Sequence, residues 1–208
     1  EAHDGRIAVA IEAAWPAAAA LIGQAGIVGV EAGGAAHGQG VLELEPGLWG
    51  GPRAFAQASH AGNVALIAAA RAALGPGPGR LLELYAGAGN LTRGFVADGW
   101  AVTASDVVAP VRPVAGAAWQ TGTAAAVVAT AAGPWDAVAL DPPRAGAADA
   151  IAGIAAAAPR VIVYVSCDPA TLGRDAAALT GYRATDAWPI DLMPHTAHVE
   201  VVLRLVRR

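Results

Sequence analysis

Short apolar runs alternate with helix-length segments from residue 80 to the end of the chain, and this alternation limits the fold more than any other feature. The runs are rich in Val, Leu and Ala and are bounded by Gly, Pro or Asp, as buried strands are. Strands that alternate with helices build a doubly wound, Rossmann-like α/β sheet, which binds ligands at the carboxyl ends of its strands. Strands are predicted over Arg80–Tyr85, Ala101–Ser105, Asp136–Leu140, Val161–Val165, Tyr182–Trp188 and His198–Val206, and helices over Phe55–Leu74, Asn90–Asp98, Ala147–Ala157 and Pro169–Thr180.

Residues 1–50 have a weaker pattern and are predicted to form a small, separate α+β unit. Gly and Pro gather between Glu45 and Pro52, which predicts a domain boundary near residue 50. The sheet domain then occupies residues 51–208. Within the first unit, strands are predicted over Arg6–Glu12 and Val41–Glu45, and a helix from Pro16.

The charge of the chain gives no overall sign of nucleic-acid binding. Its net charge is -4, and the 13 basic residues, all arginine, are spread along the sequence. We therefore expect any binding of RNA to be local or to depend on another domain. Because the chain begins at Glu1 without a methionine, we expect it to be a fragment or a processed product.

The single cysteine excludes an intramolecular disulfide and a Cys-rich metal or iron–sulfur site, and it is compatible with a reducing cytoplasm. Ala13–Val30 and Pro113–Trp135 lack charge over membrane-like lengths, but they consist mostly of Ala and Gly and contain Pro and Gln. They do not resemble membrane spans, and no signal peptide is evident. A soluble, cytoplasmic protein is predicted.

A glycine-rich turn follows the first strand of the predicted sheet, with the sequence Tyr-Ala-Gly-Ala-Gly-Asn over residues 85–90. Glycines at this place let the backbone approach a cofactor closely. A dinucleotide site has a third glycine where this chain has Thr92, so the turn favours S-adenosylmethionine over NAD. Asp106, at the end of the second strand, is a candidate for the ribose hydroxyls. An ordinary βα turn remains the alternative.

Two further motifs follow strands of the same sheet. Asp141-Pro142-Pro143-Arg144 is either a stiffened ligand-facing loop or a capped turn. Cys167 stands where a helix begins, and the positive end of the helix dipole favours its thiolate; an inert core cysteine is the alternative. Near the C-terminus, the histidines and acids of the segment 191–200 fit a polar turn better than a metal site, so no metal is predicted.

Taken together, these segments resemble the RNA uracil-5 methyltransferase family, which acts on ribosomal and transfer RNA. The resemblance covers residues from about Pro52 to the end. Phe55-Ala56-Gln57 resembles the Phe-x-Gln-x-Asn segment of the family. The most specific parts are Asp141–Gly146, Ile162–Thr171 and His195–Glu200.

The resemblance implies a methyltransferase that uses S-adenosylmethionine and acts on an rRNA or tRNA partner, with residues 1–50 as a remnant of the family's central domain. It implies that Cys167 attacks carbon 6 of uracil, that carbon 5 takes the methyl group, and that Glu200 removes the carbon 5 proton. The cofactor positions of the family fall on Gln57, Tyr85, Gly87, Gly89, Asn90, Asp106 and Asp141.

The chain departs from the family pattern at several of these places. Ser59 replaces the Asn of the Phe-x-Gln-x-Asn segment, Asp168 replaces an Asn after the nucleophile, and Asp106 replaces a Glu. Between Asp106 and Asp136 the chain is expected to be too short for a full helix between strands. Two alternatives therefore stand beside an active enzyme: a cofactor-impaired relative that binds RNA or protein, and an unrelated S-adenosylmethionine or nucleotide enzyme.

Overall fold

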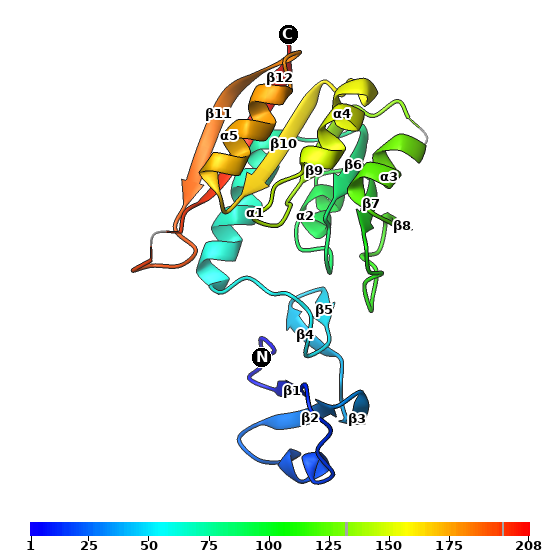
Figure 1. Ribbon diagram of the computed structural model, residues 1–208, viewed down its shortest axis with the longest axis vertical. Helices are drawn as coiled ribbons and strands as arrows, with labels where there is room; N and C mark the ends of the chain where they lie inside the picture. The colour runs from blue at the N-terminus through cyan, green and yellow to red at the C-terminus, as the bar shows by residue number, and fades with distance from the viewer. Residues whose placement is uncertain (132, 197) are drawn as a thin grey trace.

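The computed structural model describes residues 1–131, 133–196 and 198–208 (Figure 1). Its main feature is a seven-stranded sheet in the order β11-β12-β10-β9-β6-β7-β8. Only β12 runs antiparallel to its neighbours, because β12 pairs antiparallel with both β10 and β11 and the other pairs are parallel. The predicted doubly wound fold is confirmed. The strands are β6 (Arg80–Leu84), β7 (Ala101–Asp106), β8 (Ala118–Thr121), β9 (Ala137–Leu140), β10 (Val161–Ser166), β11 (Tyr182–Ile190) and β12 (Glu200–Arg207).

Helices cover both faces of this sheet, and the strands alternate their side chains between the two layers. Leu81 and Val163 face the layer of α1 and α2, whereas the adjacent Leu82 and Ile162 face α3, α4 and α5. The central strands β6, β9 and β10 are buried on both faces and therefore largely apolar, which is why they were recognisable in the sequence. The helices are α1 (His60–Leu74), α2 (Thr92–Ala97), α3 (Ala124–Thr130), α4 (Ala148–Ala157) and α5 (Pro169–Ala178).

The first helix is shorter than predicted. Residues 55–59 are not helical, because Ser59 has an extended backbone and its side chain accepts a hydrogen bond from the Gly62 amide, which caps α1. At the other end Gly75 stops the helix with a φ of 78°. The segment that contains Gln57 is therefore a connection between the two parts of the chain.

The stretch between Asp106 and Asp136 holds more structure than expected. It contains β8 and the helix α3, where no full helix was predicted. The Thr123 side chain caps α3 by accepting from the Ala126 amide, and the helix ends after seven residues. Pro110 and Pro113 lie in the loop that precedes β8. The helix packs closely on α4, since a Cβ added to Gly153 of α4 would lie 2.4 Å from Val128 of α3.

The first 50 residues form two small sheets that lie apart from the seven-stranded sheet, below it in Figure 1. The strands at Arg6–Glu12 and Val41–Glu45 are found, but the helix expected from Pro16 is only a four-residue 3-10 helix, η1 (Ala18–Leu21). The division of the chain at residue 50 stays a prediction. The strands are β1 (Ile7–Ile11), β2 (Ile27–Ala32), β3 (Ala35–Gly38), β4 (Leu42–Glu45) and β5 (Leu48–Gly50).

Among the residues that the structure describes, no helix has both the length and the apolar character needed to cross a membrane.

Candidate functional site

The turns singled out in the sequence all lie at one edge of the sheet. β6, β9 and β10 are adjacent and parallel, so the segments that follow them at residues 85–90, 141–147 and 167–168 meet at the carboxyl ends of the strands. The chain leaves β6 toward β7 on one side and returns to β9 on the other, so the strand order reverses here. Such a switch point is where open α/β sheets bind ligands.

The glycine-rich turn is tied to the end of the neighbouring strand. The Gly87 amide donates a hydrogen bond of 2.8 Å to Oδ2 of Asp106, the last residue of β7. Tyr85 begins the turn with a φ of 60°, which is rare for a residue with a side chain. A Cβ at Gly87 would meet nothing within 4 Å, so the backbone is open to a ligand at that point.

Gly89 is needed for a different reason. Its φ is 96°, and a Cβ there would lie 2.5 Å from a methyl carbon of Val114. The loop before β8 therefore packs directly on the turn, which fixes the backbone that leads into Asn90 and α2. The sequence motif alone does not distinguish these two glycines, whereas the structure gives them separate roles.

Asn90 makes a reciprocal amide pair with Asn63 of α1, a residue that the sequence did not single out. Asn90 Nδ2 donates to Asn63 Oδ1 at 2.7 Å, and Asn63 Nδ2 donates back to Asn90 Oδ1 at 3.0 Å. Asn63 also donates to Glu45 of β4 at 2.8 Å, and Arg93 of α2 binds the other oxygen of Glu45. The small N-terminal unit thus contacts the glycine-rich turn through a connected polar network.

Glu83 is a second residue that the sequence reasoning missed. It lies within β6, two residues before the turn, and is 2% exposed. Burial raises the pKa of this carboxyl group to about 8; interactions with Thr92 oppose the rise and the charge of Asp141 adds to it. The available signal was an acid inside an otherwise apolar strand, since a buried carboxylate is rare without a reason.

Cys167 and Glu200 face each other across the β10–β12 pair. Ser166, the last residue of β10, pairs with Val201 of β12 in antiparallel register, so Cys167, which follows Ser166, lies opposite Glu200, which precedes Val201. Cys167 is half-buried, and Glu200 is 8% exposed. The register therefore brings together two side chains that are 33 positions apart in the sequence.

The environment of the thiol is mixed in charge. Burial raises the pKa of Cys167, the charge of Glu200 raises it further, and Arg144 lowers it by a hydrogen bond and by its positive charge. The net direction is opposite to that expected from the helix terminus alone. Arg144 also approaches His198, with 3.2 Å between Arg144 Nη2 and the Nε2 atom of the ring.

Asp168 does not turn toward the thiol. Its Oδ1 accepts hydrogen bonds of 2.9 Å from the amides of Ala170 and Thr171, so it caps α5. These bonds hold the pKa of Asp168 below its usual range. The residue that replaces the family's Asn is thus a helix cap.

Asp141 and Glu200 form an acidic pair at the same place. Burial raises the pKa of Asp141 to about 7, and the charge of Glu200 contributes to the rise. Burial also raises the pKa of Glu200. Like charges in a site with little water disfavour full ionisation of both groups, so the pair holds a proton more readily than either acid would alone.

The remaining residues that the sequence predicted for the site make fewer contacts with the groups described above. Gln57 is half-buried in the connection before α1. Tyr85 is half-buried, and burial raises its pKa to about 12, with Asp149, Asp175 and Asp106 adding to the rise. His195 is exposed with a φ of 68°, and Ala197 lies outside the described residues. Within the described parts of the chain, no three His, Cys, Asp or Glu residues are grouped to hold a metal ion.

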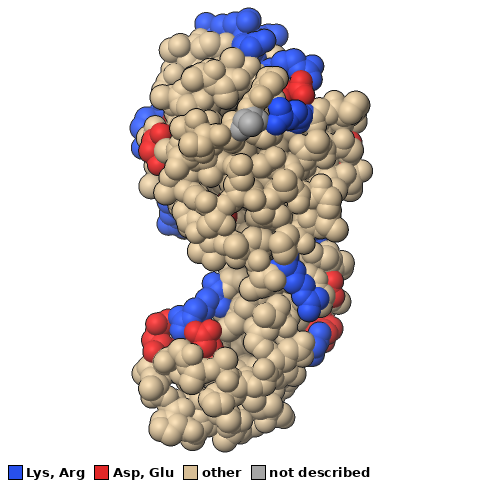
Figure 2. Space-filling model, turned by 90° about the vertical axis from the view of Figure 1, so that its right-hand side faces the viewer, with Lys and Arg blue, Asp and Glu red and all other residues tan. Residues whose placement is uncertain are grey.

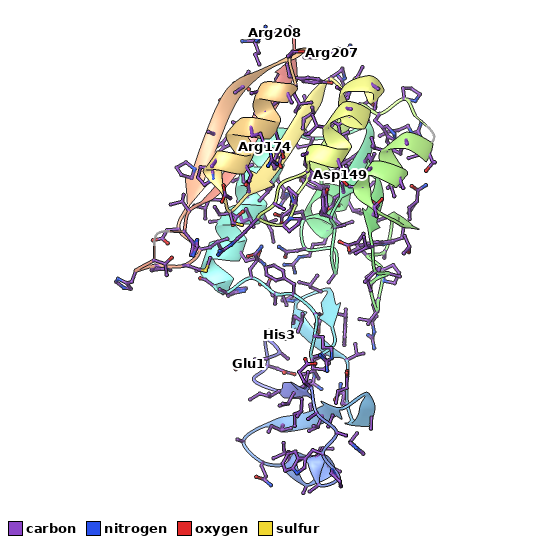
Figure 3. All side chains as sticks on the ribbon, in the orientation of Figure 1. Glu1, His3, Asp149, Arg174, Arg207 and Arg208 are labelled. Atoms are coloured by element: carbon purple, nitrogen blue, oxygen red, sulfur yellow. The ribbon has the colours of Figure 1, made fainter. Side chains whose placement is uncertain are left out.

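The arginines are less evenly spread than the sequence suggested. Exposed arginines gather at the amino ends of β6, β10 and β11 and at the end of β12, the sheet edge opposite the site. Figure 2 shows this positive end at the top, and Figure 3 labels Arg207 and Arg208 there. The group consists of Arg80, Arg160, Arg183, Arg207 and Arg208.

The chain is similar to known RNA methyltransferases. Residues 133–208 match the family described as tRNA (Uracil-5-)-methyltransferase. A 23S rRNA (uracil(1939)-C(5))-methyltransferase of Thiobacillus denitrificans is 38% identical over 169 residues, which cover 73% of this chain and 39% of the relative. One of Alkalilimnicola ehrlichii is 40% identical over 175 residues, 72% of this chain and 37% of the relative. The chain thus spans less than two fifths of the length of these curated relatives.

Among solved structures, a tRNA (uracil-54, C5)-methyltransferase of Pyrococcus abyssi, in complex with S-adenosyl-L-homocysteine, superposes with a TM-score of 0.70. It is 27% identical and matches 83% of this chain and 46% of its own.

Proposed function

We propose that this chain, which belongs to the family of RNA uracil-5 methyltransferases, transfers a methyl group to carbon 5 of a uridine in rRNA or tRNA through a covalent bond between Cys167 and uracil. The observation that carries the proposal is the placement of a thiol opposite a buried carboxyl group at the ligand-binding edge of the sheet. A cytoplasmic location is proposed with it, since a single thiol that must stay reduced suits that compartment.

Cys167 has the role of the nucleophile. Carbon 5 of uracil is a poor nucleophile until a thiolate adds to carbon 6, which moves the electron pair of the double bond onto carbon 5 and the adjacent carbonyl. Arg144 is suited to two tasks here, because it opposes the raised pKa of the thiol and carries positive charge close to the forming anion. The base must leave its stack to reach this pocket.

Glu200 has the role of the base that completes the reaction. Once carbon 5 carries the methyl group, the Glu200 carboxylate takes the proton from carbon 5, the double bond to carbon 6 re-forms, and the carbon–sulfur bond breaks to release the Cys167 thiolate. The raised pKa of Glu200 makes its carboxylate a stronger base than an exposed glutamate. The charge of Glu200 contributes to the raised pKa of Asp141, about 7, so the two acids are coupled electrostatically.

The turn at the end of β6 fits S-adenosylmethionine, which when bound supplies an electrophilic methyl group on a sulfonium sulfur. Gly87 leaves the backbone open, and the Asp106 carboxylate closes the turn from β7. The acids at this edge, with Asp141 among them, complement a positively charged sulfur. Asn90, Gln57 and Tyr85 are proposed to contribute to the same site.

The proposal is tested by incubating the chain with S-adenosylmethionine and an RNA that carries 5-fluorouridine at candidate positions. Fluorine at carbon 5 cannot leave as a proton does, so the adduct with Cys167 should persist and migrate as a larger species on a denaturing gel. Cys167→Ser should form no adduct while binding S-adenosylhomocysteine normally by calorimetry. A chain that binds the cofactor but forms no adduct with any tested RNA would instead be a non-catalytic relative.

A further inference from the structure

A buried carboxylate on α5 holds the loop that carries Asp141 and Arg144. Asp175 is 1% exposed, and its Oδ2 accepts hydrogen bonds of 2.7 Å from the Ala147 amide and from the Tyr164 hydroxyl. Ala147 is the N-cap residue of α4 and has no side chain able to cap that helix. A charge supplied from α5 therefore stabilises the positive end of α4, directly after the loop.

Arg174 adds a second connection between the same two elements. Its Nε donates to Asp175 Oδ1 at 2.8 Å, and its Nη2 donates to the backbone oxygen of Ala145 at 2.9 Å. Gly146 fits between them with a φ of 80°, and a Cβ there would lie 2.5 Å from Arg174 and 2.6 Å from Asp175. The loop is thus held at three successive residues, 145, 146 and 147.

These contacts connect the two segments beside the Cys167 thiol, which are the start of α5 and the loop that carries Arg144. Cys167 lies just before α5, one residue ahead of its N-cap Asp168, and Arg144 lies one residue before the part of the loop that Asp175 and Arg174 hold. Among the groups that face the thiol, Glu200 of β12 opposes its ionisation and Arg144 supports it. The position of Arg144 relative to α5 thus bears on how readily Cys167 ionises.

We propose that Asp175, together with Arg174, is a positioning residue for the reaction, which acts on Cys167 by holding the loop that carries Arg144 beside the thiol. The proposal rests on the function assigned to Cys167 above. Burial alone would raise the pKa of Asp175, but bonds from Ala147, Tyr164 and Arg174 outweigh it and lower the pKa, so the carboxylate stays ionised in its buried place. Asparagine at this position would present an NH2 group to donors that need an acceptor.

The test measures Cys167 directly, without RNA or cofactor. The chain has one cysteine, so the rate of alkylation by iodoacetamide across pH reports the ionisation of that thiol. Asp175→Asn should move the midpoint of the rate profile upward by about half a pH unit, which corresponds to about threefold less thiolate below the midpoint. Normalising to the rate at high pH removes any change in the accessibility of the thiol.

A double-mutant cycle with Arg144→Met separates positioning from general loosening of the fold. If Asp175 acts through Arg144, then Asp175→Asn should shift the midpoint in the wild-type background and leave it unchanged in the Arg144→Met background. Asp98→Asn is the matched control, because it removes another acid that pairs with an arginine, Arg71, at the opposite edge of the sheet. It should leave the midpoint unchanged.

Two results would overturn the proposal: a midpoint that Asp175→Asn leaves at the wild-type value, or a shift of equal size with and without Arg144. If Asp175→Asn does not fold by circular dichroism, Arg174→Met provides the same test, since the Arg174 side chain is 51% exposed and its loss leaves no buried cavity. If the 5-fluorouridine RNA forms no adduct, that result counts against the proposed function. The alkylation results do not depend on RNA, so they still show whether Asp175 affects the ionisation of Cys167.

Discussion

Replacing Glu83 with glutamine should stabilise the chain at alkaline pH and have little effect at acid pH. Glu83 is enclosed in β6, and its Oε2 has no hydrogen-bond partner among the residues that the structure describes. An ionised carboxylate in that place has lost water without gaining a compensating charge. Glutamine keeps the shape and removes the need to ionise.

The magnitude follows from the pKa of the buried group. Burial raises the pKa of Glu83 from 4.5 to about 8, so between these values the folded chain binds a proton that the unfolded chain releases. Stability due to this group is therefore fully present below pH 4.5 and is lost as pH rises to about 8. At about 1.4 kcal/mol for each tenfold change in acidity, the loss is on the order of 5 kcal/mol, comparable with the whole stability of a small domain.

Urea unfolding of both proteins at pH 5 and pH 8 checks this. The free energy of unfolding of Glu83→Gln should exceed that of the wild type by several kcal/mol at pH 8 and by much less at pH 5. The stability that Asp141 and Glu200 contribute also falls with rising pH, but both groups are present in both proteins, so the difference comes mainly from Glu83. Glu12→Gln, at a side chain that is 90% exposed, is the control. A stabilisation that is equal at both pH values would refute the reasoning.

Three further results are expected. Glu200→Gln should accumulate a methylated protein–RNA adduct on a denaturing gel, because elimination lacks its base; lost activity without adduct would indicate a structural role. The wild-type kcat/KM for RNA should rise between pH 6 and pH 9, since the raised pKa values of Cys167 and Glu200 leave less of the active forms at low pH; a flat profile would contradict this. Binding of single-stranded RNA, measured by fluorescence anisotropy, should be weak, and the logarithm of the binding constant should fall with the logarithm of the salt concentration with a slope of roughly 2. A steeper slope that becomes shallower in Arg183→Ala and Arg208→Ala would instead show that phosphates bind at the amino edge of the sheet.

The central strands of the main sheet could be predicted because they are buried on both faces, whereas the edge strand β8 is mostly exposed and was not predicted. The central strands have continuous apolar sequences with Gly, Pro or Asp at their ends, and a run such as Val161–Val165 needs no further information. The strands β2 and β3 are short and contain glycines and alanines, which interrupt the apolar pattern, so they were not predicted. The helix α3 was missed for a similar reason, because it consists mostly of small side chains and packs closely against Gly153.

The site could be predicted in part, for a related reason. Turns that follow parallel strands must meet at one edge, so the positions of Cys167 and Asp141 follow from the strand order. Cys167 and Glu200 lie opposite each other because of the register of β10 with β12, and no local sequence pattern predicts that register. The network of Glu45, Asn63 and Asn90 joins segments far apart in the chain, and only the folded structure brings them together.

The distribution of charge explains why the site suits a flipped base better than an RNA backbone. Asp106, Asp141 and Glu200 lie at the carboxyl edge together with Arg144, and the group of five exposed arginines lies at the opposite edge. With these acids present, a neutral uracil base fits the site better than a phosphate does, and a cationic cofactor is favoured. The adduct becomes anionic only after the thiolate has added, which is when the charge of Arg144 is required. The placement of Arg144 beside Cys167 is therefore the arrangement on which the proposed reaction most depends, and it is the one that Asp175 and Arg174 hold.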